Sequence, residues 1–168
     1  SRITKNKGIE IVIESAKIIH SKNKKIKFFI IGDGEEKNCL EKYCKKNNLD
    51  NIQFLGFRKN VMDYIDCFNL IIQPSFSEGL GLTAIEAISR SKPVVASNIP
   101  GLNEVIINNY NGKLFPVGDY NKLVFAIEEL YEDNFKLKKL ENNAFEYYLN
   151  NFKLENYLEK HLKVYKTS

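Results

Sequence analysis

Short apolar runs alternate along the chain with longer stretches in which apolar residues recur every three or four positions. The short runs are bounded by turn-forming residues, as strands buried on both faces are. They predict strands at 27–31, 52–55, 70–73, 93–96 and 113–115. The periodic stretches predict helices at 9–19, 35–47, 81–89, 102–107, 120–131, 135–149 and 154–165. This order predicts a single α/β domain over residues 1–168, with a Rossmann-like parallel sheet sandwiched by helices.

The start of the chain departs from this order. A βαβ array normally opens with a strand, whereas residues 1–8 contain no apolar run and lead almost at once into the first helix. We therefore expect the sheet to lack its first strand.

Composition narrows the class of protein. The net charge is +4, 43% of the residues are hydrophobic and 27% are charged, as in ordinary globular domains. No apolar run has the length of a membrane span. The three cysteines lack metal-ligand spacing and predict reduced thiols, and His20 and His161 lie away from any motif, which argues against a zinc site or a Ser-His-Asp triad. Basic runs such as 22–27 lack interleaved aromatics, so nucleic acid is not an expected partner.

The candidate chemistry lies in the segment 73–87, which follows the third predicted strand. In parallel sheets, ligands bind at the carboxyl ends of the strands. Gly79 and Gly81 let a ligand approach the backbone, and the first N–H groups of the next helix suit a diphosphate. Glu86, on the polar side of that helix, can accept two hydrogen bonds from a ribose diol. Glu78, in the loop, is placed to hold the hydroxyls of a sugar.

Each of these residues also has a plainer interpretation. Glu86 and Arg90 are four residues apart and could form a surface ion pair. The two glycines could serve only the turn, and Glu78 could favour the helix N-terminus through its charge. Two carboxylates repel the phosphates of a ligand, however, so their presence in this loop favours a ligand that also carries hydroxyls.

The segment 78–87 resembles the two-glutamate signature of glycosyltransferase family 4, a large family of retaining enzymes with the GT-B fold. Further matches to that family follow in its order along the chain: Arg2, 7–8, 31–34, 54–57, Val61, 93–97, Gly101, 104–105, 111–112 and 118–119. The resemblance implies that residues 1–168 form the C-terminal, donor-binding half of such an enzyme. It also implies an N-terminal domain, absent from this sequence, that binds the acceptor.

The same resemblance implies roles for individual residues. Arg2 and Lys7 would neutralise the donor diphosphate and, with Glu78 at the transferred sugar, are the implied catalytic residues. Glu86 would hold the ribose. The remaining implied donor contacts come from two segments and are largely through the main chain: Gly79, Leu80, Gly81, Leu82 and Thr83 for phosphate and sugar, and Gly56, Phe57, Arg58 and Val61 for the nucleobase.

The implied activity is transfer of a sugar from a UDP- or GDP-sugar to a glycan, lipid or other acceptor, in cell-surface polysaccharide or glycolipid synthesis. The family uses no metal or other cofactor for this step. A cytoplasmic location follows, and peripheral association of the full enzyme with the inner face of the membrane is left open. A chain holding only this half is expected to bind donor without transferring the sugar.

Three alternatives remain open from the sequence. The chain could be a non-catalytic sugar-nucleotide-binding module, or another GT-B enzyme such as a sugar-nucleotide epimerase. A dinucleotide oxidoreductase built on Gly32, Asp33 and Gly34 is the third, but Lys37 stands where that fingerprint needs its third glycine.

The chain also departs from the family pattern at a few positions. Leu80 stands where the family usually has Phe, and Asn98 and Pro100 replace an Asp and a Gly in a loop beside the donor pocket. Ser91 replaces a glycine that ends a helix, which predicts strain at that residue or a different helix end.

The family also suggests where the missing strand belongs. Its first strand is central, so the strands at 27–31 and 70–73 would flank an empty slot. We expect these strands to pair directly, another chain to fill the slot, or the sequence to be part of a longer protein, because buried unpaired backbone groups are costly.

Overall fold

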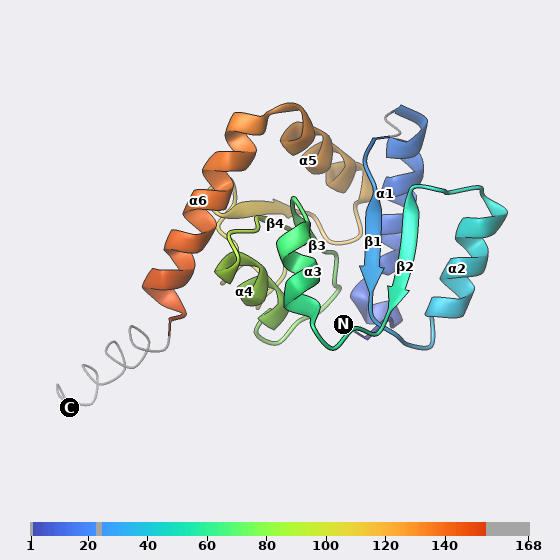
Figure 1. The fold of residues 1–168 in the computed structure, drawn as a ribbon, viewed down its shortest axis with the longest axis horizontal. Coiled ribbons are helices and arrows are strands. Elements are labelled where there is room, and N and C mark those ends of the chain that lie inside the picture. The colour runs from blue at the N-terminus through green and yellow to red at the C-terminus, as the bar shows by residue number, and fades with distance from the viewer. Residues whose placement is uncertain (1, 23–24, 154–168) are drawn as a thin grey trace.

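The computed structural model describes residues 2–22 and 25–153, which form an α/β fold (Figure 1). All five predicted strands are present, with ends that shift by no more than a residue or so. They are β1 (Phe28–Ile31), β2 (Ile52–Gly56), β3 (Ile71–Gln73), β4 (Val94–Ser97) and β5 (Gly112–Phe115). Every strand pair is parallel, which confirms the predicted sheet type.

The sheet is divided into two parts, β1–β2 and β3–β4–β5. Among the described residues no backbone pairing joins β1 to β3, so the prediction that these strands pair directly is wrong. The two other expectations for the slot remain predictions. Side chains connect the parts instead: Phe29 of β1 stacks on Phe68, which precedes β3, with ring centroids 5.5 Å apart.

Residues 2–8 lie between the carboxyl ends of β1 and β3. Arg2 forms a single parallel bridge with Asp33, and Ile3 donates a backbone hydrogen bond to Asp33 O over 2.8 Å. Further along, Phe76 N donates to Asn6 O over 2.9 Å. The segment does not form a complete strand. It lies beside the carboxyl end of β1 and so keeps that end apart from β3.

The helices cover both faces of the sheet. They are α1 (Ile9–Lys22), α2 (Lys37–Lys46), α3 (Val61–Cys67), α4 (Leu82–Ser89), α5 (Tyr120–Glu132) and α6 (Asn134–Asn151), and a 3-10 turn, η1 (Lys5–Lys7), precedes α1. The side chains of Asp119 and Asp133 cap the N-termini of α5 and α6. No helix in the described part of the chain is long and apolar enough to cross a membrane.

Alternation along the strands creates two cores. Ile72 and Val95 face the layer of α1 and α5, whereas Ile71, Val94 and Ala96 face α4 and α6. Burying one large aliphatic side chain contributes about 1.5–3 kcal/mol, so these two layers supply much of the driving force for folding. A third cluster joins α1, β1 and α2.

One predicted helix is wrong, and one observed helix was not predicted. The predicted helix at 102–107 is a series of turns, in which Leu102 O accepts hydrogen bonds from Val105 N and Ile106 N. The apolar spacing correctly marked residues of the core, because Leu102, Val105 and Ile106 are all buried. Consecutive turns bury residues at this spacing as well as a helix does. The short helix α3 was not predicted, and the predicted helix at 154–165 lies outside the described residues.

Ser91 confirms the strain predicted at the end of α4. Its φ is 58°, in the left-handed region that favours glycine. Ser91→Gly is therefore expected to raise the free energy of unfolding by about 0.5–1 kcal/mol. Ser89→Gly, two residues earlier and inside α4, is the matched control and should lower it by about 0.5–1 kcal/mol. Urea denaturation measures both, and a loss of stability in Ser91→Gly would contradict the strain.

Candidate functional site

The candidate site begins where η1 rests against the loop that follows β3. Gly8 ends η1 with φ 61°, and a Cβ added there would lie 2.2 Å from Pro74 O. Only glycine allows this approach together with this backbone conformation. The approach brings Lys7, one residue earlier, to the loop that carries Glu78.

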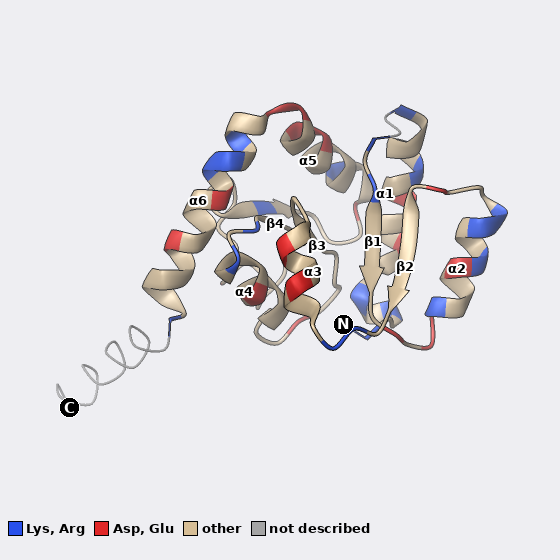
Figure 2. Ribbon diagram, in the orientation of Figure 1, with Lys and Arg blue, Asp and Glu red and all other residues tan. Residues whose placement is uncertain are grey.

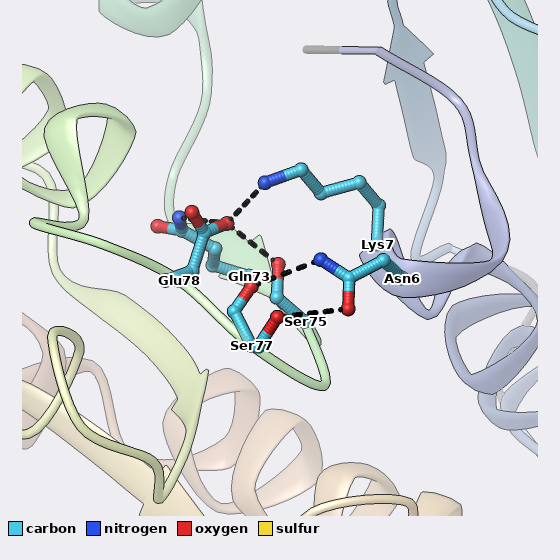
Figure 3. Close-up of polar contacts among 6 residues, drawn as sticks. All are labelled: Asn6, Lys7, Gln73, Ser75, Ser77 and Glu78. Carbon is cyan, nitrogen blue, oxygen red and sulfur yellow. Dashed lines mark hydrogen bonds and ion pairs between the residues drawn. The ribbon is translucent and has the colours of Figure 1, made fainter.

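Three donors converge on one oxygen of the Glu78 carboxylate (Figure 3). Lys7 Nζ lies 2.6 Å from Glu78 Oε1, Ser75 Oγ lies 2.8 Å from it, and Gln73 Nε2 lies 3.2 Å from it. Within the described residues, the second oxygen, Oε2, accepts no hydrogen bond. Glu78 is therefore held on one side and has acceptor capacity left on the other.

This environment keeps Glu78 ionised. Burial raises the pKa of its carboxyl, but the hydrogen bonds from Lys7, Ser75 and Gln73 and the charge of Lys7 outweigh burial and lower the pKa below its usual value. The carboxylate consequently stays charged at pH values where an isolated glutamate begins to take up a proton.

A second pair of contacts ties the loop to η1. Asn6 Nδ2 donates to Ser77 O over 3.2 Å, and Ser77 Oγ donates to Asn6 Oδ1 over 3.0 Å. Both contacts are exposed and do not involve the Glu78 side chain (Figure 3). They fasten the two segments whose side chains meet at Glu78.

The loop leads into the N-terminus of α4, where unpaired N–H groups are available. Gly81 precedes the helix with φ 65°, and none of the N–H groups of residues 79–83 donates a hydrogen bond within residues 2–22 and 25–153. Leu80 and Leu82 are exposed, and nothing lies within 4 Å of a Cβ placed on Gly79. The backbone here is open to a ligand, and the helix dipole adds positive potential.

A turn beneath the loop supports this arrangement. Gly101 has φ 83°, and a Cβ added there would lie 2.5 Å from Gly79 O and 2.9 Å from Glu78 O. Glu104 Oε1 accepts a hydrogen bond from Gly101 N over 3.3 Å and so closes this turn itself. The turn at Gly101 thus packs against the backbone of Glu78, while hydrogen bonds and an ion pair hold its side chain.

Glu86 lies half-buried on the second turn of α4, as its position on the polar side predicts. The plainer interpretation of an ion pair with Arg90 is wrong, because Arg90 Nη1 lies 3.5 Å from Asp66 Oδ2 on α3. In the part of the chain that the structure describes, the Glu86 carboxylate has no hydrogen-bond or ion-pair partner. Thr83, one turn earlier, is also half-buried.

The segment matched to nucleobase binding follows β2. Gly56 has φ 71°, Phe57 is 67% exposed, and Arg58 lies over the Tyr64 ring at 5.9 Å. Val61 is the first residue of α3. Among the described residues, no hydrogen bond or ion pair joins this segment to the loop that carries Glu78.

Basic residues gather at this end of the sheet. Figure 2 shows Lys and Arg positions on the segment before α1 and on the loop before α3, both close to the carboxyl ends of β1 and β2. Arg2, the second residue predicted to contact the diphosphate, is exposed, and its backbone is fixed by the bridge to Asp33. Its side chain makes no ion pair with a described residue.

The cysteines do not pair with one another. Cys39 and Cys67 are exposed, and Cys44 is buried. No group of three His, Cys, Asp or Glu side chains in the described residues is arranged to hold a metal ion.

Two polar partners of Glu78 were not predicted. Gln73 is the last residue of β3 and Ser75 follows it closely, and the structure brings both onto Glu78. The signal in the sequence was the polar Gln73 at the end of an apolar run. Nothing in the spacing showed that the loop would turn Glu78 back onto it.

Comparison with known proteins shows the family of this chain. Residues 1–147 match the model of the family described as glycosyl transferases group 1. The chain is 35% identical over 143 residues to an uncharacterized glycosyltransferase of Methanocaldococcus jannaschii, covering 84% of this chain and 39% of that protein. It is 30% identical over 167 residues to the poly(ribitol-phosphate) alpha-N-acetylglucosaminyltransferase of Staphylococcus aureus, covering 98% of this chain and 34% of that protein.

A solved structure has the same fold. A mutant of Staphylococcus aureus TarM, in complex with Fondaparinux, alpha-GlcNAc-glycerol and UDP, superposes with a TM-score of 0.90 at 30% identity, over 97% of this chain and 34% of TarM. The chain thus spans between about a third and two fifths of the length of these relatives. Its α/β fold is that of one domain of the GT-B glycosyltransferases, and the chain belongs to the glycosyl transferases group 1 family.

Proposed function

We propose that the protein is a retaining glycosyltransferase of family 4 and that this domain, residues 1–168, binds its nucleoside-diphosphate-sugar donor. One observation carries the proposal: the unpaired N–H groups at the start of α4 lie beside an ionised Glu78 that has a free oxygen. Anion donors next to a carboxylate acceptor suit a ligand that carries both phosphates and hydroxyls.

The diphosphate would bind at the N-terminus of α4. The N–H groups of residues 79–83 and the helix dipole favour a negative group there, and Lys7 and Arg2 bring further positive charge. In the free protein Lys7 is paired with Glu78, so Lys7 would turn toward the phosphates when the donor binds. The same groups would stabilise the charge on the leaving diphosphate as the bond to the sugar breaks.

The sugar and the nucleoside would lie on either side of the phosphates. Glu78 Oε2 would accept a hydrogen bond from the transferred sugar, and the unpartnered carboxylate of Glu86 would accept from the ribose. Main-chain groups from Gly56 to Arg58, with Val61, would meet the base. The UDP in the TarM complex supports uracil over guanine as that base.

The rest of the reaction would depend on more than this domain. The relatives are about two to three times as long, which supports an N-terminal acceptor-binding domain in the complete enzyme. The acceptor would be a glycan, a lipid or another acceptor in cell-surface polysaccharide or glycolipid synthesis. Two Staphylococcus aureus relatives, named for poly(ribitol-phosphate) and for capsular polysaccharide biosynthesis, support a polymeric acceptor. The transfer would take place in the cytoplasm, at or near the inner face of the membrane, without a metal or other cofactor.

The proposal is tested by calorimetry with UDP and with UDP-, GDP- and ADP-sugars. A bond to a charged acceptor contributes about 1.5–3 kcal/mol, so Glu86→Ala is expected to weaken UDP binding by about tenfold to a hundredfold. Glu146→Ala, at an exposed position of α6, is the control and should bind UDP normally. Normal UDP affinity in a folded Glu86→Ala protein would remove Glu86 from the ribose, and a wild-type protein that binds none of these nucleotides would end the proposal.

A further inference from the structure

We propose that Gln73 and Ser75 are positioning residues for Glu78. They hold one oxygen of its carboxylate so that the other stays turned toward the sugar of the donor. This inference rests on the proposed function, because it assigns a purpose to the geometry around a residue that is itself proposed to bind sugar.

Burial shows that neither residue touches a ligand directly. Gln73 is 7% exposed and Ser75 is 1% exposed, so both lie behind the loop. Their donors reach the same atom, Glu78 Oε1, at 3.2 Å from Gln73 Nε2 and 2.8 Å from Ser75 Oγ. Figure 3 shows both side chains reaching the Glu78 carboxylate. Any effect of these two residues on the donor must therefore pass through Glu78.

Gln73 keeps its amide at a cost in stability. The two residues before it in β3, Ile71 and Ile72, pack into the two cores. An apolar side chain at position 73 would lie on the same face as Ile71 and could extend that layer. The Gln73 Oε1 atom is instead buried with no hydrogen-bond partner in the described residues. A buried unpaired acceptor is destabilising. The contact that this side chain does make is the hydrogen bond from its Nε2–H group to Glu78.

Lys7 alone cannot keep the Glu78 carboxylate in position when the donor binds. It also contacts Glu78 Oε1, but its side chain is 24% exposed and, under the proposed function, within reach of the donor phosphates. Binding of a diphosphate would draw Lys7 away, and the carboxylate would then be free to rotate. Gln73 and Ser75 carry no charge and are fixed by the strand end, so they hold Oε1 in place while Lys7 moves.

The experiment compares two probes, UDP and UDP-N-acetylglucosamine, by calorimetry on the whole protein. Gln73→Met and Ser75→Ala keep the approximate shape of each side chain and remove the donor. Each is expected to weaken UDP-N-acetylglucosamine binding about tenfold, the loss of one charge-assisted hydrogen bond, and to change UDP binding less than twofold. Circular dichroism checks the fold, and either variant alone is enough for the test.

A double-mutant cycle with Glu78→Gln separates positioning from general damage. If Gln73 and Ser75 act through Glu78, their substitutions cause no further loss of sugar-nucleotide affinity in the Glu78→Gln protein. Ser21→Ala, which removes an exposed hydroxyl near the C-terminal end of α1 and away from Glu78, should bind both probes normally.

The outcomes distinguish the inference from the proposed function. Additive losses, equal losses for UDP and UDP-N-acetylglucosamine, or unchanged binding of both probes would overturn the positioning role while leaving donor binding intact. A wild-type protein that binds neither probe and no GDP- or ADP-sugar would overturn the proposed function, and the positioning role with it. If it binds a GDP- or ADP-sugar instead, that sugar nucleotide and its nucleoside diphosphate replace the two probes.

Discussion

Replacing Glu78 by glutamine is expected to lower the rate of sugar transfer by about two to three orders of magnitude while the fold is kept. Preorganised charged contacts at a reacting centre are typically worth this much. Glutamine keeps the shape of the side chain, but it loses the charge that three donors now stabilise. Release of UDP from a UDP-sugar by the whole enzyme measures kcat.

The matched control is Glu146→Gln on α6, which makes the same chemical change at an exposed position away from the site. It should transfer sugar at the wild-type rate. If Glu78→Gln also keeps its kcat within about twofold of wild type, Glu78 has no part in the transfer. Its ion pair with Lys7 would then be a structural contact only.

Gly8→Ala is expected to lower the free energy of unfolding by about 3 kcal/mol and to weaken donor binding as well. A left-handed alanine costs about 1–2 kcal/mol, and overpacking adds about 1–3 kcal/mol. Here the new Cβ would lie 2.2 Å from Pro74 O, so η1 must move away from the loop. That movement separates Lys7 from Glu78. Urea denaturation and calorimetry with UDP measure the two effects.

Gly79→Ala is the control for stability, since nothing lies within 4 Å of a Cβ at that position. It should change the free energy of unfolding by less than about 0.5 kcal/mol. Equal stability losses in the two alanine variants would show that the contact between Gly8 and Pro74 is not the cause. A stable Gly8→Ala protein would contradict the close approach itself.

The strands could be predicted because each is a short apolar run between turn formers, and the structure confirms all five. The helices were harder to predict wherever a helix and a series of turns bury residues at the same spacing. Leu102, Val105 and Ile106 are buried by consecutive turns with the same spacing that a helix would use. The helix α3 escaped prediction because it is only seven residues long and carries two aspartates.

The site could be predicted only in part. The sequence placed Glu78 and Glu86 in the loop and on the first turns of α4, because those positions follow from chain order. It could not show that Gln73 and Ser75 meet Glu78, since this depends on how the loop folds back over the end of β3. Nor could it show that β1 and β3 remain apart, which depends on where residues 2–8 lie.

The most direct test of the account is a crystal structure of the protein with bound UDP. The account predicts the diphosphate within hydrogen-bonding distance of the N–H groups of residues 79–83, the ribose on Glu86, and Lys7 turned from Glu78 toward the phosphates. UDP bound elsewhere, with the pair of Lys7 and Glu78 undisturbed and the N-terminus of α4 open, would contradict it.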